Sequence, residues 1–189
     1  MIVILVGPSG AGKTTLCKKL LEYDDNLVYS LSATTREKRK GEIEGKDYYF
    51  LTEGEFKDWE KKGRFLEVAK VHDYYYGTPK DMVLKSLSDN KDVIMDIDVQ
   101  GAEIIKKKMD DVVSIFILPP NLEEARRRIK VRGMYNRTEL QNRMKAARKE
   151  IKEIRNFDYA VVNDDLKECA KVIKSIIIAE KHSIDRMEV

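Results

Sequence analysis

The stretch Gly7-Pro8-Ser9-Gly10-Ala11-Gly12-Lys13-Thr14 decides the fold of this chain. It matches the pattern G-x-x-x-x-G-K-[ST], in which the N–H groups of a glycine-rich loop converge on phosphate oxygens and the helix that follows directs its positive dipole end at them. The apolar run Ile2 to Val6 precedes it and predicts a strand buried on both faces. A helix is expected from Lys13 to about Glu22. The motif therefore lies between a strand and a helix, as phosphate binding requires.

The residue types in this loop predict roles at a nucleotide. Lys13 would reach the β and γ phosphates, and Thr14 would offer its hydroxyl to Mg²⁺. Either Asp96 or Asp98, at the end of the predicted strand from Val93 to Ile97, would hold the water shell of the metal. A glycine-rich turn without a ligand is the alternative, which the agreement of motif and context disfavours. GTPases, ATPase motors and small-molecule kinases all carry this loop, so it does not identify a second substrate.

The rest of the chain alternates between apolar runs and charged, helix-like stretches. Besides the first run and Val93 to Ile97, strands are predicted at Val112 to Leu118 and Tyr159 to Val162. This alternation predicts an α/β fold with a parallel sheet. A final helix is expected from Leu166 to Ala179, with four apolar residues at helical spacing that should face the sheet: Ala170, Ile173, Ile177 and Ile178.

Two segments interrupt the alternation. From about 33 to 81, short strands are predicted at 48–51 and 65–71, and Thr52 with Glu55 forms a capping box for a helix running to Lys62. We interpret this segment as an inserted small α+β lobe. The second interruption, Arg132 to Arg137, contains a glycine and separates two helical stretches, the second of which Thr138 and Gln141 could cap. We therefore expect one domain over 1–189, with a core of 1–32, 82–125 and 156–189, a lobe of about 33–81 and a mobile lid of about 126–155.

Composition excludes several classes of protein. The 36 basic and 33 acidic side chains among 189 residues give a net charge of +3, which argues against a nucleic-acid partner. The two cysteines and two histidines stand far apart, so neither a disulfide framework nor a zinc site is indicated. The first apolar run is too short for a signal peptide or a membrane span. We expect a cytoplasmic protein without a membrane partner, either a monomer or a homodimer.

Part of the inserted segment has the composition of a phosphate site. Ser32-Ala33-Thr34-Thr35-Arg36 leads through Arg39 to Glu42, so two arginines lie three residues apart beside several hydroxyls, and Gly45 to Phe50 follows with two tyrosines. Arginine forks bind phosphate oxygens in pairs, and a tyrosine hydroxyl adds a directed donor. The segment is thus a candidate seat for a phosphomonoester. Taken alone, a solvated charged turn would explain it as well.

These strings, SATTR, R-x-G-E and G-x-DY-x-F, resemble the GMP-binding segment of the guanylate kinase family of P-loop nucleoside monophosphate kinases. The stretches Phe65 to Val68 with Tyr75 to Thr78, Asp96 to Ala102, and Asn163 to Leu166 resemble the second substrate stretch, the acidic strand end and the adenine-side motif of that family. The likeness covers essentially the whole chain. It implies a three-layer P-loop core with a GMP lobe inserted after the second strand, and Mg²⁺-dependent transfer of the ATP γ-phosphoryl group to GMP, giving ADP and GDP.

The resemblance also implies the site residues. For ATP these are Gly7, Pro8, Ser9, Gly10, Ala11, Gly12, Lys13, Thr14, Thr15, Arg132, Arg137, Asn163 and Asp164. For GMP they are Ser32, Arg36, Arg39, Tyr48, Glu67, Tyr76, Thr78 and Asp98. For catalysis they are Lys13, Arg39, Arg132 and Arg143. Chemistry supports Glu67 as the reader of the base, because guanine presents N1–H and N2–H₂ side by side to a carboxylate, whereas adenine would leave that carboxylate unpaired.

The predicted lid is rich in arginine. Seven arginines lie between 126 and 148: Arg126, Arg127, Arg128, Arg132, Arg137, Arg143 and Arg148. Fixed cations and the exclusion of water favour phosphoryl transfer, so some of them should act on the phosphates. We interpret Arg126 to Arg128 instead as a solvated helix face paired with Glu123 and Glu124. Met134-Tyr135 replaces the Thr-Asp or Thr-Glu usual in the family, which predicts altered closure or nucleotide preference.

Two other functions remain open at this point. Guanylate-kinase-like domains of scaffold proteins hold partner peptides, but they typically have damaged phosphate loops, whereas Lys13 and Thr14 are present here. A kinase of the same fold with another phosphate acceptor is the second alternative. The SATTR segment, Glu67 and Tyr76 argue against it.

Overall fold

A five-stranded parallel sheet forms the centre of the molecule. The computed structural model describes residues 1–71, 73–133 and 137–186, without the side chain of Arg132. The strands of this sheet follow the order β2-β7-β1-β8-β9, and all neighbouring strands are parallel. Their bounds are β1 Ile2–Val6, β2 Leu27–Tyr29, β7 Asp92–Asp96, β8 Val112–Leu118 and β9 Tyr159–Val162. Every residue of β1 is buried, as expected for the central strand of a sheet covered on both faces.

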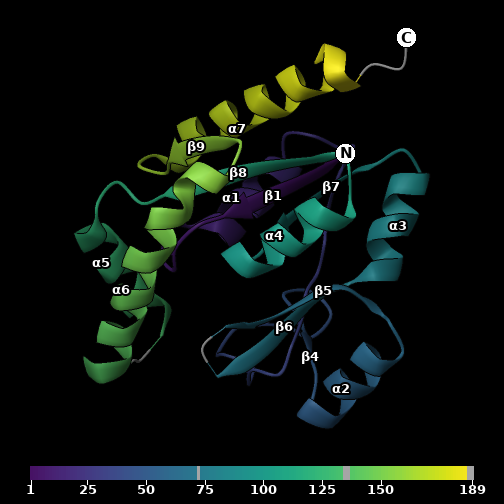
Figure 1. Ribbon diagram of the computed structural model, residues 1–189. Helices are drawn as coiled ribbons and strands as arrows, with labels where there is room; N and C mark the ends of the chain where they lie inside the picture. The colour runs from purple at the N-terminus through teal and green to yellow at the C-terminus, as the bar shows by residue number, and fades with distance from the viewer. Residues whose placement is uncertain (72, 134–136, 187–189) are drawn as a thin grey trace.

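Helices cover both faces of this sheet, which gives the core three layers (Figure 1). On one face, α1 and α7 pack against side chains of β1 and β8. On the other face, α3 and α4 pack against the opposite side chains of β1 and β7. These helices are α1 Lys13–Leu21, α3 Lys80–Ser88, α4 Val99–Lys108 and α7 Leu166–Lys181. The three-layer α/β core predicted from the sequence is confirmed.

A second sheet and one helix, here called the small lobe, are inserted between β2 and α3. The sheet has the order β4-β3-β6-β5 and consists of β3 Ala33–Thr34, β4 Tyr49–Phe50, β5 Phe65–Val71 and β6 Tyr74–Pro79. Helix α2, Glu53–Lys61, begins with the predicted capping box: Thr52 accepts a bond from the Glu55 N–H, and the Glu55 carboxylate accepts one from the Thr52 N–H. Phe56 is the buried centre of this lobe and stacks on Phe65 at 4.6 Å.

Strand β5 joins the small lobe to the core. Leu66 packs within the hydrophobic cluster under α3 and α4, and Lys108 of α4 donates a hydrogen bond from Nζ to the Leu66 carbonyl at 2.7 Å. The small lobe lies below the core sheet in Figure 1, and α5 and α6 lie to its side. The carboxyl ends of β1 and β7 therefore open toward both of these parts, which is where ligands bind in open α/β sheets.

The arginine-rich region forms two helices, α5 Leu122–Arg132 and α6 Arg137–Lys152, followed by a short 3-10 turn over Glu153–Asn156. The predicted break between the helices agrees with these bounds. The prediction that Thr138 caps the second helix was wrong, because Thr138 lies inside α6. The prediction for Met134-Tyr135 falls outside the described residues.

One expectation for α7 was also wrong. Ala170, Ile173 and Ile177 are buried against the sheet as predicted, but the side chain of Ile178 is 49% exposed. Successive residues of a helix point about 100° apart, so Ile177 and Ile178 do not share a face.

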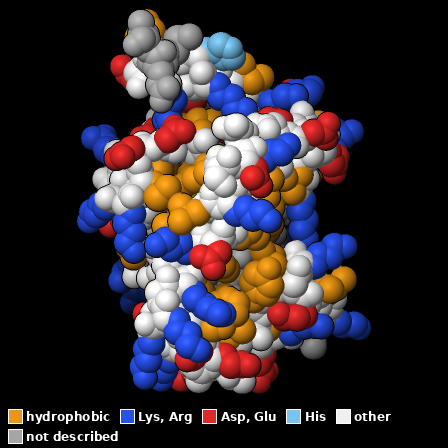
Figure 2. Space-filling view, turned by 90° about the vertical axis from the view of Figure 1, so that its right-hand side faces the viewer, with side chains coloured by type: hydrophobic (Ala, Val, Ile, Leu, Met, Phe, Trp, Pro, Cys, Tyr) orange, Lys and Arg blue, Asp and Glu red, His pale blue; other side chains and the backbone are white. Residues whose placement is uncertain are grey.

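The surface agrees with the near-balanced charge of the chain. Basic and acidic side chains are interspersed over the face seen in Figure 2. Among the described residues, no helix has both the length and the apolar character that a membrane crossing demands.

Candidate active site

The loop between β1 and α1 has a backbone that requires glycine, as Gly7 and Gly12 show. Gly7 has φ of 140°, and a Cβ there would lie 2.2 Å from the Ile117 carbonyl oxygen of the neighbouring strand β8. Gly12 has φ of 92° and is the N-cap of α1, where a Cβ would lie 2.4 Å from Nδ2 of Asn163. Because α1 begins at Lys13, directly after the loop, the positive end of its dipole is directed at the loop.

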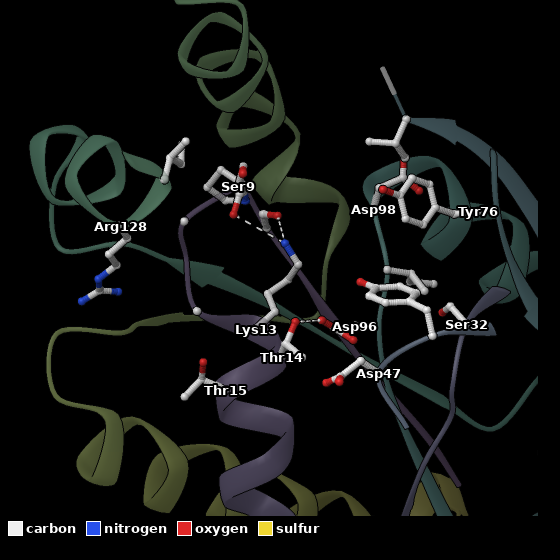
Figure 3. Close-up of a pocket in the computed structure, with 18 of the residues that line it drawn as sticks. Ser9, Lys13, Thr14, Thr15, Ser32, Asp47, Tyr76, Asp96, Asp98 and Arg128 are labelled. Carbon is white, nitrogen blue, oxygen red and sulfur yellow. Dashed lines mark hydrogen bonds between the residues drawn. The ribbon is translucent and has the colours of Figure 1, made fainter. Parts of the chain in front are cut away.

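Lys13 reaches back across this loop, and Thr14 is directed at Asp96 (Figure 3). The Lys13 Nζ donates to the carbonyl oxygen of Gly7 at 2.5 Å and lies 3.5 Å from that of Pro8. The Thr14 hydroxyl donates to Oδ2 of Asp96 at 2.5 Å. The structure therefore brings Asp96, from the end of β7, directly against Thr14, while Asp98 lies farther along the chain as the N-cap of α4.

Asn163, directly after β9, holds the backbone of the phosphate loop. Asn163 is buried, and its Nδ2 donates to the Ala11 carbonyl at 2.7 Å. Its own carbonyl accepts a bond from Arg128 of α5 at 3.1 Å. Of the predicted adenine-side pair, Asn163 thus contacts the loop backbone, whereas Asp164 is exposed to solvent.

A cavity of about 710 Å³ extends from this loop to the small lobe and to α5 and α6. Its size suits a nucleotide-sized ligand. Figure 3 shows the loop residues on one side and Ser32, Tyr76 and Asp98 on the other, with Lys13 between them. The predicted site residues that line it are Gly7, Pro8, Ser9, Gly10, Gly12, Lys13, Thr14, Thr15, Ser32, Arg39, Tyr48, Glu67, Tyr76, Asp96, Asp98 and Arg143.

Glu67 is the most deeply buried carboxylate of this wall. Its side chain is 4% exposed, and Oε1 accepts a hydrogen bond from the Thr78 hydroxyl at 2.7 Å. Burial raises the pKa of the Glu67 carboxyl to about 7. Gly101 at the start of α4 permits this position, because a Cβ there would lie 2.8 Å from Oε2 of Glu67. Thr78 is completely buried behind Glu67 and does not line the cavity.

Asp98 lies beside Glu67 and is held by the backbone of α4. Its Oδ1 accepts a bond from the Gly101 N–H at 2.9 Å, in the usual manner of a helix N-cap. Burial raises the pKa of the Asp98 carboxyl above its ordinary value. Two carboxylates of raised pKa therefore face the same part of the cavity.

The two arginines of the small lobe occupy different environments. Arg36 is 6% exposed and binds Glu42 through two hydrogen bonds of 2.9 Å, while its guanidinium lies 5.3 Å from the ring centre of Tyr48. Arg39 is closer to solvent and lines the cavity, with its guanidinium 3.8 Å from Glu42. Arg36 thus lies behind the wall, although it was predicted beside Arg39 at the phosphate.

The arginines of α5 and α6 are divided between the cavity and the surface. Arg143 of α6 lines the cavity, and Arg137 is exposed at the first residue of that helix. The side chain of Arg132, at the end of α5, is not part of the described structure. Arg127 and Arg128 bind Glu124 at 2.7 and 2.8 Å and lower the pKa of that carboxyl to about 2, as the interpretation of a charge-paired helix face predicts. Both Arg127 and Arg128 also line the cavity, so the interpretation as a purely solvated helix face was wrong for these two residues.

Sequence reasoning missed several residues that line the cavity or contact its lining. Tyr29, at the end of β2, donates its hydroxyl to Oδ1 of Asp96. Lys18 of α1 binds Asp47 of the small lobe at 2.8 Å, so an ion pair joins the two parts of the molecule. Glu150 lies two helical turns after Arg143 on the cavity face of α6, and burial raises the pKa of its carboxyl. The Lys18–Asp47 pair joins residues far apart in sequence, and no local pattern could have identified it.

Comparison with known proteins agrees with this architecture. The family model described as Guanylate kinase matches residues 1–180. A guanylate kinase of Caldanaerobacter subterraneus subsp. tengcongensis is 48% identical over 186 residues, which cover 98% of this chain and 90% of that protein. A guanylate kinase of Clostridium perfringens is 48% identical over 188 residues, 100% of this chain and 87% of that protein.

A solved structure gives the same result. The crystal structure of guanylate kinase from Anaplasma phagocytophilum matches with a TM-score of 0.83 and 37% sequence identity, over 98% of this chain and 88% of that one. The chain therefore belongs to the guanylate kinase family, and it is a phosphotransferase.

Proposed function

We propose that this protein is a guanylate kinase that transfers the γ-phosphoryl group of Mg-ATP to GMP, giving ADP and GDP. The observation that carries the proposal is the buried carboxylate of Glu67, which lines the same cavity as the phosphate loop. One part of the cavity suits the phosphates of a donor nucleotide, and the other offers a carboxylate, hydroxyls and Arg39 to a nucleoside monophosphate.

Glu67 supports guanine as the base. A buried carboxylate accepts hydrogen bonds from the N1–H and N2–H₂ groups of guanine together. These bonds replace the hydrogen bonds to water that the carboxylate lost on burial. Adenine presents an acceptor at N1, so it would leave the carboxylate without a donor. Thr78 fixes the Glu67 side chain through its 2.7 Å hydrogen bond, and Ser32 and Asp98 lie on the same side of the cavity.

The residues near Thr14 fit Mg²⁺. The Thr14 hydroxyl and the Asp96 carboxylate offer only oxygen atoms, the ligands that Mg²⁺ prefers. Among residues 1–71, 73–133 and 137–186 there is no group of three or more His, Cys, Asp or Glu that could hold a metal. Mg²⁺ keeps several waters and binds through one or two protein groups and the substrate phosphates, so Thr14 and Asp96 would be sufficient protein partners for it. When bound, Mg²⁺ supplies positive charge at the β and γ phosphate oxygens.

Positioning and charge are sufficient for the transfer, and no protein base is needed. The Lys13 ammonium lies at the mouth of the phosphate loop and would turn from the carbonyl oxygens it now binds toward the phosphates. Arg39 would hold the GMP phosphate, and Arg143 would stabilise the charge that develops on the transferred group. The roles assigned to Arg132 and Arg137 stay predictions.

The alternatives are less well supported. A peptide-binding module would not need the strained glycine loop with Lys13 and Thr14 in place. A kinase for another acceptor would not need a desolvated carboxylate at Glu67.

The test is ADP production in a coupled assay with Mg-ATP and, separately, GMP, AMP, CMP, UMP or buffer. We expect ADP with GMP and a rate at least about 100-fold lower with the other acceptors, since an unpaired buried polar group is strongly disfavoured. No ADP with any acceptor, from protein that binds ATP, would contradict the proposal.

A further inference from the structure

The carboxylate of Asp96 is held from both sides. The Thr14 hydroxyl donates to Oδ2 at 2.5 Å, and the Tyr29 hydroxyl donates to Oδ1. Strand β2 pairs with β7 so that Tyr29 lies opposite Ile94, two residues before Asp96 on the same face of the strand. The phenol ring therefore extends along the sheet to the carboxylate.

The Tyr29 ring is itself fixed by packing. It lies against the hydrophobic cluster that α1 and α7 form on the sheet, close to the first turns of α1. The hydrogen bond shows the role of the hydroxyl, since a neutral phenol donates and the Asp96 carboxylate can only accept.

We infer that Tyr29 is a positioning residue for Asp96, which orients this carboxylate for the metal–nucleotide complex. The inference rests on the proposed function. The last torsion of an aspartate side chain has a broad energy minimum, so the carboxylate rotates unless donors fix it. The Thr14 oxygen would offer a lone pair to a metal ion while its O–H still donates to Oδ2, and the Tyr29 hydroxyl would hold the other carboxylate oxygen, Oδ1.

Tyr29→Phe removes this donor and keeps the ring. Loss of such an outer partner typically costs 10- to 100-fold in metal affinity or activity. Mg²⁺ should increase the affinity for ATP, and this gain is the ratio of the dissociation constant in EDTA to that in Mg²⁺. We expect the gain to fall by about tenfold in Tyr29→Phe. The affinity for ATP in EDTA should stay within about twofold, because the phosphate loop itself is unchanged. Isothermal titration calorimetry gives both constants.

Tyr159→Phe is the matched control. The Tyr159 hydroxyl also donates to a carboxylate, that of Glu180, and its ring packs on the same hydrophobic cluster, but it lies on β9 away from the cavity. The control should keep the Mg²⁺-dependent gain of the wild type, because its hydroxyl does not line the cavity. A general loosening of the core would change both variants alike.

Three results would overturn the inference: a wild-type chain without any Mg²⁺-dependent gain in ATP affinity, an unchanged gain in Tyr29→Phe, or an equal loss of gain in Tyr159→Phe. The coupled assay separates these from failure of the proposed function. Wild-type protein that makes ADP with GMP while Tyr29→Phe binds like wild type contradicts only the role of Tyr29. Wild-type protein that makes no ADP with GMP contradicts the function itself.

Discussion

Replacing Glu67 by glutamine should make the protein more stable at pH 8 and at the same time weaken its affinity for GMP. The side chain is 4% exposed, and burial raises the pKa of its carboxyl from the ordinary 4.5 to about 7. Each factor of ten in a protonation equilibrium corresponds to 1.36 kcal/mol, so the ionised carboxylate costs the folded state about 3 kcal/mol. Glutamine keeps the shape and an oxygen that accepts the Thr78 bond, but it carries no charge.

The pH dependence of the free energy of unfolding shows whether the buried charge of Glu67 is the cause of this difference. In the unfolded chain the Glu67 carboxyl loses its proton near pH 4.5, and in the folded protein near pH 7. Between these values the folded state binds more protons, so this group lowers the free energy of unfolding as the pH rises through that window. The Glu67→Gln variant has no such group. The stability difference between variant and wild type should therefore grow from near zero at pH 4.5 to about 3 kcal/mol above pH 7.

GMP binding should show the opposite dependence. Only the ionised carboxylate accepts both guanine donors, so the affinity of the wild type for GMP should fall as the pH drops below about 7. Two hydrogen bonds to a charged group contribute about 3 kcal/mol or more, so Glu67→Gln should weaken GMP binding by at least about 100-fold.

Urea denaturation at pH 5 and pH 8 measures the stability difference between variant and wild type and its change with pH. Titration calorimetry with GMP measures the affinity. Glu53→Gln is the control, because that carboxylate is 68% exposed on α2 and should change neither stability nor binding. The reasoning would be refuted if Glu67→Gln were no more stable than the wild type at pH 8, or if its gain were the same at both pH values.

The remaining predictions concern the phosphate loop and the small lobe. Lys13→Ala and Arg39→Ala should each lower kcat/KM for GMP by about 100-fold in the coupled assay with an unchanged circular dichroism spectrum, and near-normal turnover would contradict that residue's role. Gly12→Ala should cost about 2 kcal/mol in urea denaturation, because its φ of 92° and a neighbouring amide 2.4 Å away exclude a methyl group. Gly54→Ala, in the open first turn of α2, should instead stabilise by about 0.5 kcal/mol, and a loss like that of Gly12→Ala would refute the backbone argument. Arg36→Ala should destabilise by about 3 kcal/mol, since it leaves a carboxylate without its two-bond partner, and unchanged stability would show that this pair is not structural.

Local patterns in the sequence were sufficient for much of the fold. Strands β1, β5, β8 and β9 have the predicted bounds, because short stretches rich in apolar residues and bounded by turn residues leave few alternatives. The capping box at Thr52 is likewise a local interaction between residues three apart. The prediction for Thr138 failed because the position where a helix begins also depends on the residues before it. The prediction for Ile178 failed because this residue points about 100° away from Ile177, off the buried face of the helix.

The sequence by itself determined the phosphate loop, the α/β core, the family and most residues that line the cavity, since each is encoded in short strings in a fixed order. Only the tertiary structure decided how these residues act together. It selects Asp96 rather than Asp98 as the partner of Thr14, buries Arg36 behind the wall with Glu42, and brings Tyr29 to Asp96. The register of neighbouring parallel strands and the depth of burial set the Asp96 contacts and the raised pKa of Glu67, and both arise from packing between residues far apart in the chain.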